Sequence, residues 1–125
     1  MKGVVITTKN TMYIKDLEKP ILESVNQVVS GPSENLRPMF LPDPYCMLVN
    51  EEGLKDELDL NFTGCMLYGT ALHECPIVGD IVILKLVRGK EGFDFAGLTD
   101  TDIDRVCQYI TKVTRGQVKK IADRN

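Results

Sequence analysis

Two short apolar runs limit the folds that are open to this chain. Residues 45–49 read Tyr-Cys-Met-Leu-Val, and residues 81–87 are apolar except for Lys85. Asn50 follows the first run and Asp80 precedes the second, so polar turn formers bound both. This length and these boundaries are typical of strands rather than helices. The sequence therefore predicts a small sheet, in which the fully apolar run at 45–49 is a central strand.

The N-terminal part of the chain adds a hairpin and a helix. Residues 3–8 and 11–17 read as two strands, and the short connection between them ends in Asn10, which tolerates a positive φ. In residues 20–30, Pro20 stands where a first helical residue would, and the apolar side chains recur at helical spacing. We therefore expect a hairpin followed by a helix over residues 20–30.

The other segments are irregular, apart from one helix near the C-terminus. Residues 32–44 carry four prolines and read as an extended, irregular segment, and residues 88–98 hold three glycines and read as a loop. A helix begins after Thr99, because threonine is a good N-cap and Asp102 stands where an acid can complete the cap. Residues 114–125 read as a frayed basic tail. This order predicts an α+β fold, with a small mixed or antiparallel sheet of about five strands and two helices packed on it.

The composition excludes several classes of function. A chain of 125 residues with 43% hydrophobic and 26% charged residues suits a single domain over residues 1–125. The net charge of −3 argues against a nucleic-acid-binding protein that works through a bulk positive field. No apolar run approaches the ~20 residues of a membrane-spanning helix. Residues 7–10 end the first apolar stretch too soon for a secretory signal, so we expect a cytoplasmic protein.

The single histidine, His73, and the four cysteines restrict the catalytic chemistry. Cys65, His73 and Cys75, with Cys46 as a fourth ligand, are candidates for a zinc site. Structural zinc sites usually have close pairs of ligands, and this set has only the pair His73 and Cys75, so we expect no metal and no other cofactor. An alternative function is a small hydrolase in which Cys65 or Cys75 is the nucleophile and His73 its base.

Acidic side chains gather in one predicted turn. Residues 51–59 hold five acids and one lysine, and they lack the ligand pattern of an EF-hand loop. Three interpretations fit this turn: a solvated loop, an interaction surface for a basic partner, or a patch that resembles DNA phosphate. Glu51 and Glu52 are also the candidate carboxylate pair of the alternative hydrolase.

Four basic residues are candidates for an anion pocket. These are Arg37, Lys85, Arg88 and Lys90, and the last two adjoin a loop whose glycine N–H groups can approach a phosphate. The chain contains neither a Walker pattern nor a dinucleotide-binding glycine pattern. Solvated surface charge is the other interpretation of the same four residues.

The middle of the chain resembles a known family. Residues 47–53 read Met-Leu-Val-Asn-Glu-Glu-Gly, residues 58–61 read Leu-Asp-Leu-Asn, and residues 77–82 read Ile-Val-Gly-Asp-Ile-Val. Over residues 40–88 these motifs resemble the family called domain of unknown function 3846, although Asp59 stands where proline is usual. That family is found largely in bacteriophages, plasmids and other mobile elements and has no established activity. The resemblance therefore implies an accessory protein of a mobile element.

The polar positions of these motifs also suit a structural role. Asn50, Glu51, Glu52, Asn61 and Asp80 are residue types that form turns by bonding to nearby backbone groups. We expect this role, rather than catalysis, for the set.

Together these features predict a non-enzymatic phage or mobile-element protein that counters or modulates a bacterial host defence system by stoichiometric binding. The expected ligand is a host protein, held by the acidic turn and a strand edge, or a small nucleotide-derived signal, held at a homo-oligomer interface. We expect neither a membrane nor nucleic acid as partner. The alternatives are the hydrolase and an acidic DNA-mimic inhibitor. The candidate ligand-binding residues are Arg37, Asn50, Glu51, Glu52, Asn61, Arg88 and Lys90.

Overall fold

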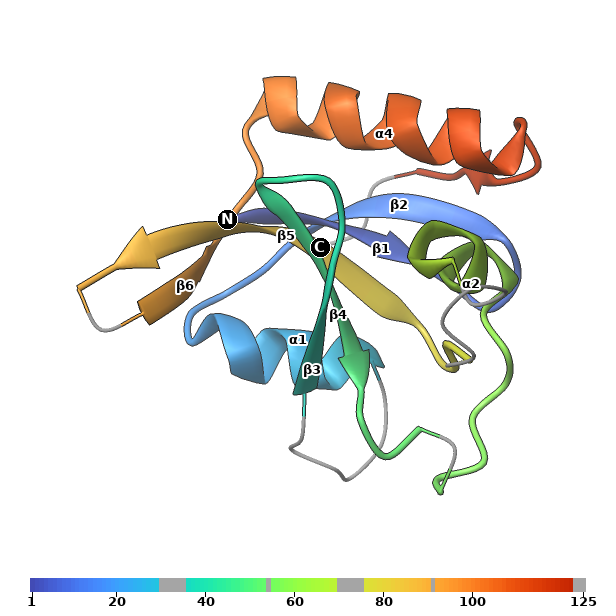
Figure 1. Ribbon diagram of the computed structural model, residues 1–125, viewed down its shortest axis with the longest axis horizontal. Coiled ribbons are helices and arrows are strands. Elements are labelled where there is room, and N and C mark those ends of the chain that lie inside the picture. Colours follow the sequence, from blue (N-terminus) through green and yellow to red (C-terminus); the bar gives the residue numbers. More distant parts are fainter. Residues whose placement is uncertain (30–35, 54, 70–75, 91, 123–125) are drawn as a thin grey trace.

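Seven strands form one mixed sheet in the computed structural model, which describes residues 1–29, 36–53, 55–69, 76–90 and 92–122. The strand order is β3-β4-β5-β1-β2-β7, with β6 paired to β5 (Figure 1). The strands are β1 (Lys2–Ile6), β2 (Thr11–Asp16), β3 (Leu36–Phe40), β4 (Tyr45–Asn50), β5 (Ile81–Gly89), β6 (Gly92–Ala96) and β7 (Lys119–Lys120). The helices of the described residues are α1 (Ile21–Val29), α2 (Phe62–Tyr68) and α4 (Asp100–Thr114). The α+β class is confirmed, but the predicted numbers of about five strands and two helices are too low.

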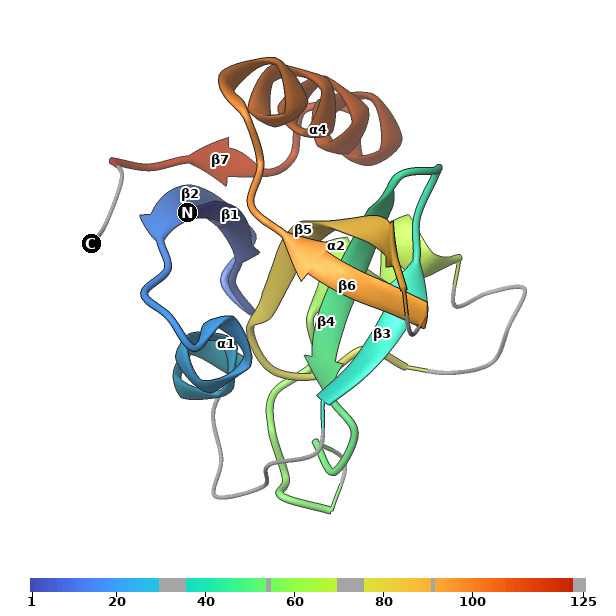
Figure 2. The same cartoon turned by 90° about the vertical axis from the view of Figure 1, so that its left-hand side faces the viewer.

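Helices lie on both faces of the sheet (Figure 2), and apolar side chains form a core on each face. On one face, α2 and α4 pack over a core that contains Met47 and Ile83. On the other face, α1 packs over a core that contains Leu48 and Val82. Because successive side chains of a strand point to opposite faces, a strand covered on both sides must be apolar at every position. This explains why both runs are apolar almost throughout, and the predicted strands β4 and β5 are confirmed.

The N-terminal hairpin and helix are confirmed. β1 and β2 pair antiparallel, and Asn10 at the end of their connection has a φ of 59°. Met12 packs into the core under α4, whereas the adjacent Tyr13 packs into the core under α1. The α1 helix occupies Ile21–Val29, which agrees with the predicted 20–30 except that residue 30 lies outside the described residues.

The strand β3 corrects the prediction of an irregular segment over residues 32–44. Its residues pair antiparallel with β4, and Pro38 stands opposite Leu48. Proline interrupts the ladder of a central strand because it has no N–H, but an edge strand tolerates it. β3 is the end strand of the sheet, which reconciles its proline with strand geometry.

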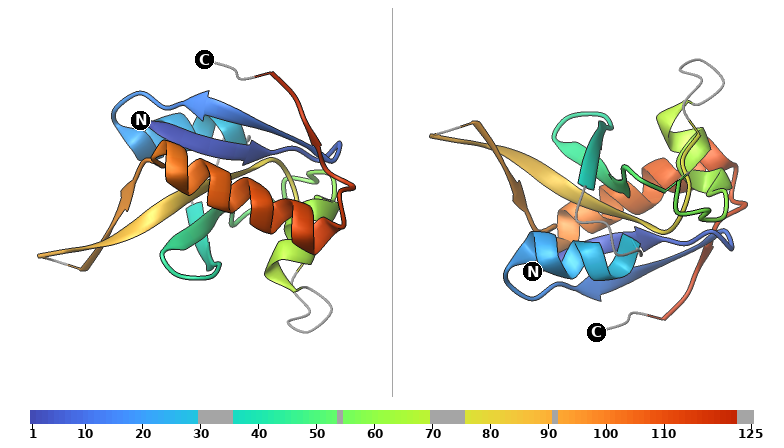
Figure 3. Two further views of the ribbon diagram at one scale, coloured as in Figure 1. Left: turned by 90° about the horizontal axis from the view of Figure 1, so that it is seen from above. Right: turned by 90° about the horizontal axis from the view of Figure 1, so that it is seen from below.

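The strand β6 corrects the prediction of a loop over residues 88–98. It pairs with the second half of β5, from Lys85 opposite Ala96 to Gly89 opposite Gly92. The two strands form an arm that projects from the rest of the molecule (Figure 3). The glycines near the turn dominate the local sequence, while the stabilising contacts come from the opposite strand, so a local pattern misses them.

The predicted start of α4 is confirmed. The Thr99 hydroxyl accepts a hydrogen bond from the Asp102 N–H at 3.1 Å, and the Asp102 carboxylate accepts one from the Thr99 N–H at 2.9 Å. These two bonds form a complete capping box, which satisfies two N–H groups that the first helical turn leaves without partners.

The tail expected to fray over residues 114–125 contains the short strand β7. It runs parallel to β2, with the Lys119 N–H donating to the Asn10 carbonyl at 3.0 Å and the Ile121 N–H donating to the Met12 carbonyl at 2.9 Å. Backbone hydrogen bonds therefore hold the chain beyond α4 against the sheet, at least as far as Ile121.

Candidate functional site

A groove of about 590 Å³ lies where three segments distant in sequence meet: α2, the β1–β2 turn, and the chain at the C-terminal end of α4. These segments come together at one end of the molecule (Figure 3). We call it the α2 groove. Its lining includes Asn10, Phe62, Thr63, Cys65, Met66, Val113 and Gln117. Among the described residues, none of those that line the groove is charged.

Two large apolar side chains on α2 are exposed at the groove. Phe62 is 58% exposed and Met66 is 40% exposed. They are four residues apart, so they lie on one face of the helix, one turn from each other. The opposite face of α2 is buried, with Leu67 in the core of the sheet. The helix is therefore apolar on its solvent side as well as on its core side.

Asn61 fixes the position of α2. Its side-chain oxygen accepts a hydrogen bond from the Gly64 N–H at 2.8 Å, which caps the helix. Its side-chain nitrogen donates to the carbonyls of Ile6 at 3.1 Å and Gly79 at 2.9 Å. Asn61 is fully buried. This predicted ligand-binding residue therefore lies in the interior and joins α2 to β1 and to the turn before β5.

Further contacts close the base of the groove. The Thr63 hydroxyl lies 3.3 Å from the Asn10 side-chain oxygen, so it joins α2 to the β1–β2 turn. The Cys65 sulfur accepts a hydrogen bond from the Ile77 N–H at 3.3 Å. Gly69 ends α2 with a φ of 77°, a conformation that favours glycine. Sequence analysis missed this helix, although Asn61 and Gly69 are a typical N-cap and C-terminal residue eight positions apart.

Basic residues are frequent in the segments that form the groove. From Arg105 to Ile121 inclusive the chain has five basic residues and no acidic one. Lys9 precedes Asn10, and Arg115 lies between Val113 and Gln117. Five cations of these segments are exposed, namely Lys9, Lys112, Arg115, Lys119 and Lys120, and two of them, Lys112 and Lys120, line a second pocket beside α4 and β7. Within the described part of the chain, none of these five forms an ion pair.

The acidic turn lies on the other side of the sheet from α4 and β7 (Figure 1). Asn50 begins this turn: its side-chain oxygen accepts from the Glu52 N–H at 2.9 Å, and its backbone carbonyl accepts from the Gly53 N–H at 3.0 Å. Its side-chain nitrogen lies 3.3 Å from the Asp56 carboxylate. The family motif Asn-Glu-Glu-Gly is therefore a turn closed by its own asparagine, as in an Asx turn.

The predicted ligand-binding residues do not form one pocket. Arg37, Asn50 and Glu51 line a small cavity of about 110 Å³. Arg37 precedes Pro38, which stands opposite Leu48 of β4, and Leu48 in turn stands opposite Val82 of β5. Arg88 and Lys90 lie on the arm, and Arg88 is six residues beyond Val82 along β5, or about 20 Å from it. The structure therefore separates the cations that the anion pocket needs.

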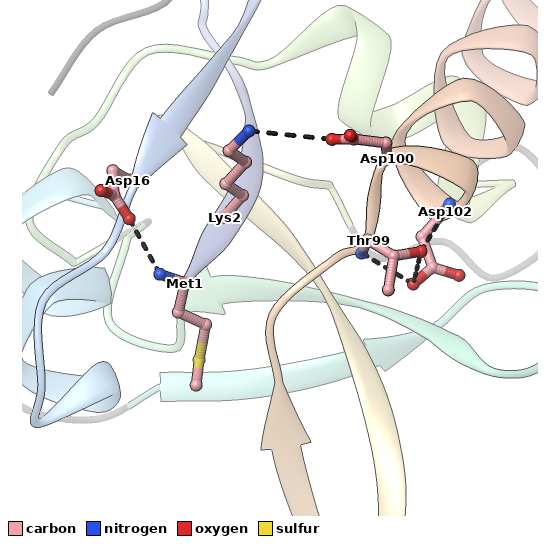
Figure 4. Close-up of polar contacts among 6 residues, drawn as sticks. All are labelled: Met1, Lys2, Asp16, Thr99, Asp100 and Asp102. Atoms are coloured by element: carbon pink, nitrogen blue, oxygen red, sulfur yellow. Dashed lines mark hydrogen bonds and ion pairs between the residues drawn. The ribbon is translucent and has the colours of Figure 1, made fainter.

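The fourth cation of that set, Lys85, pairs with a buried acid. Its ammonium lies 2.9 Å from the Asp102 carboxylate. That carboxylate also accepts hydrogen bonds from the Tyr45 hydroxyl at 2.8 Å and from the Thr99 N–H and hydroxyl at 2.9 Å each. Figure 4 shows the Thr99–Asp102 contacts beside two surface ion pairs, Met1 with Asp16 and Lys2 with Asp100.

The pKa shifts in this network are those expected of residues that stabilise the fold. Burial raises the pKa of Asp102, but the hydrogen bonds from the Thr99 backbone, Lys85, Tyr45 and the Thr99 hydroxyl outweigh it and hold the pKa well below its usual range. Burial, together with the bond to Asp102, raises the pKa of Tyr45. Asp102 is therefore a carboxylate that ties β4, β5 and α4 together.

The described cysteines are weak candidates for nucleophiles. Burial raises the pKa of the Cys46 thiol to about 11, so it stays protonated at neutral pH. Cys65 is half-buried against Ile77. The other two members of the predicted catalytic and zinc sets, His73 and Cys75, lie outside the described residues. Over the part of the chain that is described, no three His, Cys, Asp or Glu side chains come close enough to hold a metal ion.

No helix in the described ranges is long and apolar enough to cross a membrane.

Comparison with known protein families gives a match over most of the chain. The family model described as "Domain of unknown function (DUF3846)" matches residues 1–114. No curated protein and no solved structure matches the chain significantly.

Proposed function

The chain belongs to the family described as domain of unknown function (DUF3846), and we propose that it is a non-enzymatic accessory protein of a phage or mobile element. It acts in the cytoplasm of the bacterial host by stoichiometric binding of one host protein. That binding counters or modulates a host defence system. The α2 groove is the face that binds.

The observation that carries this proposal is the apolar outer face of α2. Phe62 and Met66 are exposed side by side on the wall of a groove of about 590 Å³. Contiguous exposed apolar surface is rare on soluble monomers and marks interaction sites, and large apolar anchors in grooves supply most of the binding energy of an interface. This surface favours a partner that covers it.

Two other observations support binding over hydrolysis. The asparagines of the family motifs, Asn50 and Asn61, bond to neighbouring backbone groups and so serve the fold. The Cys46 thiol has a pKa raised by burial to about 11, which is the opposite of what an activated nucleophile needs.

The same geometry favours the α2 groove over the acidic turn as the binding face. The acidic turn begins at Asn50, which stands opposite Leu36 of the edge strand β3. β3 contains Pro38, which has no N–H to offer an added strand. This edge is therefore poorly suited to binding a partner by strand addition.

Native mass spectrometry of the protein purified from phage-challenged bacteria tests the proposal. We expect a complex with one host polypeptide at fixed stoichiometry. In Phe62→Ala this complex should be lost, whereas Phe40→Ala should retain it. Phe40 is a matched control because it is 69% exposed on β3, outside the groove.

Either of two outcomes would contradict the proposal: retention of a small nucleotide-like mass with no host polypeptide, or equal capture by the two phenylalanine variants. A circular dichroism spectrum of each variant verifies that the fold is intact. If Phe62→Ala fails this check, Met66→Ala is used in its place, because it removes the second exposed side chain of the same wall.

A further inference from the structure

We infer that the α2 groove takes an acidic amphipathic helix of its protein partner. This inference rests on the proposed function and adds the chemistry of the bound segment. Three features of the groove carry it: an apolar lining, helical walls whose interior backbone groups bond within the helices, and neighbouring cations that form no ion pair among the described residues.

The lining requires an apolar face on the partner. Phe62 and Met66 on α2 face the groove together with Val113 from the C-terminal end of α4. The polar groups of the lining are few, and Thr63 and Asn10 already contact each other at 3.3 Å. Side chains that enter the groove therefore gain most by being apolar, since a buried polar group without a partner loses its hydrogen bonds to water.

The walls of the groove favour a partner segment whose backbone hydrogen bonds are made within the segment itself. Away from the helix ends, residues of α2 and α4 use their N–H and C=O groups within their helices, and the Cys65 carbonyl is bonded to the Gly69 N–H at 2.9 Å. The helical walls therefore offer no row of donors and acceptors to an extended strand. A helix makes its own backbone hydrogen bonds except at its two ends, and it presents apolar residues at i, i+3, i+4 and i+7 to a groove of this kind.

The rim requires negative charge on the exposed face of that helix. Lys9 precedes the lining residue Asn10, and Arg115 lies between the lining residues Val113 and Gln117. Lys119 is also close, because its N–H donates to the Asn10 carbonyl at 3.0 Å. The chain as a whole has a net charge of −3, so the cluster is a local reversal of the overall charge. A complementary potential raises the association rate and rejects basic competitors.

Two designed peptides test the inference in fluorescence anisotropy with the purified full chain. Both are stapled helices with leucine at i, i+3, i+4 and i+7. One carries glutamate at its other positions, and the other carries lysine. We expect the acidic peptide to bind at least about tenfold more tightly than the basic one, and its affinity to fall as salt is raised.

Charge-reversal variants locate the effect. Lys9→Glu/Arg115→Glu should weaken binding of the acidic peptide by about tenfold. Lys55→Glu/Lys90→Glu is the matched control, because it makes the same change in net charge at exposed positions away from the groove. It should leave the affinity nearly unchanged. Phe62→Ala should weaken binding of both peptides.

The results separate failure of this inference from failure of the proposed function. Equal affinity for the acidic and basic peptides, or equal weakening by the two double variants, would overturn the inference. The proposed function would still stand if the host polypeptide were captured and lost in Phe62→Ala. Absence of any peptide binding would overturn the inference as well, and the mass-spectrometry experiment would then decide the proposed function alone.

Discussion

The two ends of α4 differ in how they use polar and charged residues. At the N-terminal end, Asp102 is 5% exposed and meets Lys85, Tyr45 and Thr99 within 2.9 Å. At the C-terminal end, the cations Lys112 and Arg115 are exposed beside an apolar groove and have no ion-pair partner among the described residues. We call the N-terminal end of α4 the closed end, because its polar groups bond to one another, and the C-terminal end the open end, because its cations do not.

This difference separates stability from binding. A buried carboxylate with four donors is positioned by the fold, and its loss leaves a cation and a hydroxyl without their partner. Exposed lysines beside apolar side chains stabilise the folded chain little, because water already solvates their charge. Substitutions at the closed end are therefore expected to change the free energy of unfolding, and substitutions at the open end to change affinity.

The largest expected effect is on the anchor of the groove wall. Asn61→Ala should lower the free energy of unfolding by about 3 kcal/mol, since it removes the cap of α2 and leaves the buried carbonyls of Ile6 and Gly79 without a donor. Urea denaturation measures this loss. Gln27→Ala, an exposed amide on α1, is the control and should stay within about 0.5 kcal/mol of the wild type. A loss at Asn61 no larger than in this control would contradict the anchoring role.

At the closed end of α4, Asp102→Asn should lower the free energy of unfolding by about 2 kcal/mol. The substitution keeps the shape but removes the charge that faces Lys85. Asp104→Asn, at an exposed position of the same helix, should change it by less than about 0.5 kcal/mol. Equal losses in the two variants would show that the network adds nothing beyond helix charge.

The pH dependence of this effect has a defined sign. The pKa of Asp102 is lower in the folded than in the unfolded chain, so its stabilisation is present above the unfolded pKa of about 4 and is lost as the pH falls towards the folded pKa. The difference in unfolding free energy between wild type and Asp102→Asn should therefore shrink below about pH 4. Asp80, whose pKa is raised by burial, is present in both proteins and drops out of the difference. A difference that grew on acidification would contradict the sign.

The smallest expected effect on stability is at the open end. Phe62→Ala should change the free energy of unfolding by less than about 0.5 kcal/mol because the ring is 58% exposed. Leu67→Ala in the same helix, where the side chain is 6% exposed, should cost at least about 2 kcal/mol. Thermal unfolding of the pair measures the contrast. A comparable loss in Phe62→Ala would mean that the ring supports the fold, which would remove it as a binding anchor.

Local patterns predicted the elements that carry their own signals. The apolar runs of β4 and β5, the helical spacing in α1 and the Thr99–Asp102 cap of α4 all lie within a few residues, and the structure confirms each of them. Prediction failed where a distant partner decides the outcome. Pro38 became compatible with a strand only because β3 is at the sheet edge, and β6 formed only because β5 extends far enough to pair with it.

The sequence by itself determined the α+β class, the central strands, the capped helix and the family. The first three depend on side-chain patterns or on a cap between residues three positions apart, and the family depends on short motifs within residues 47–82. Only the tertiary structure decided that Asn61 is a buried anchor, that Arg37 and Arg88 are far apart, and that Phe62 meets Val113 across a groove. These relations involve residues up to 55 positions apart in the sequence, so only the folding of the sheet and the packing of α2 and α4 set the distances between them.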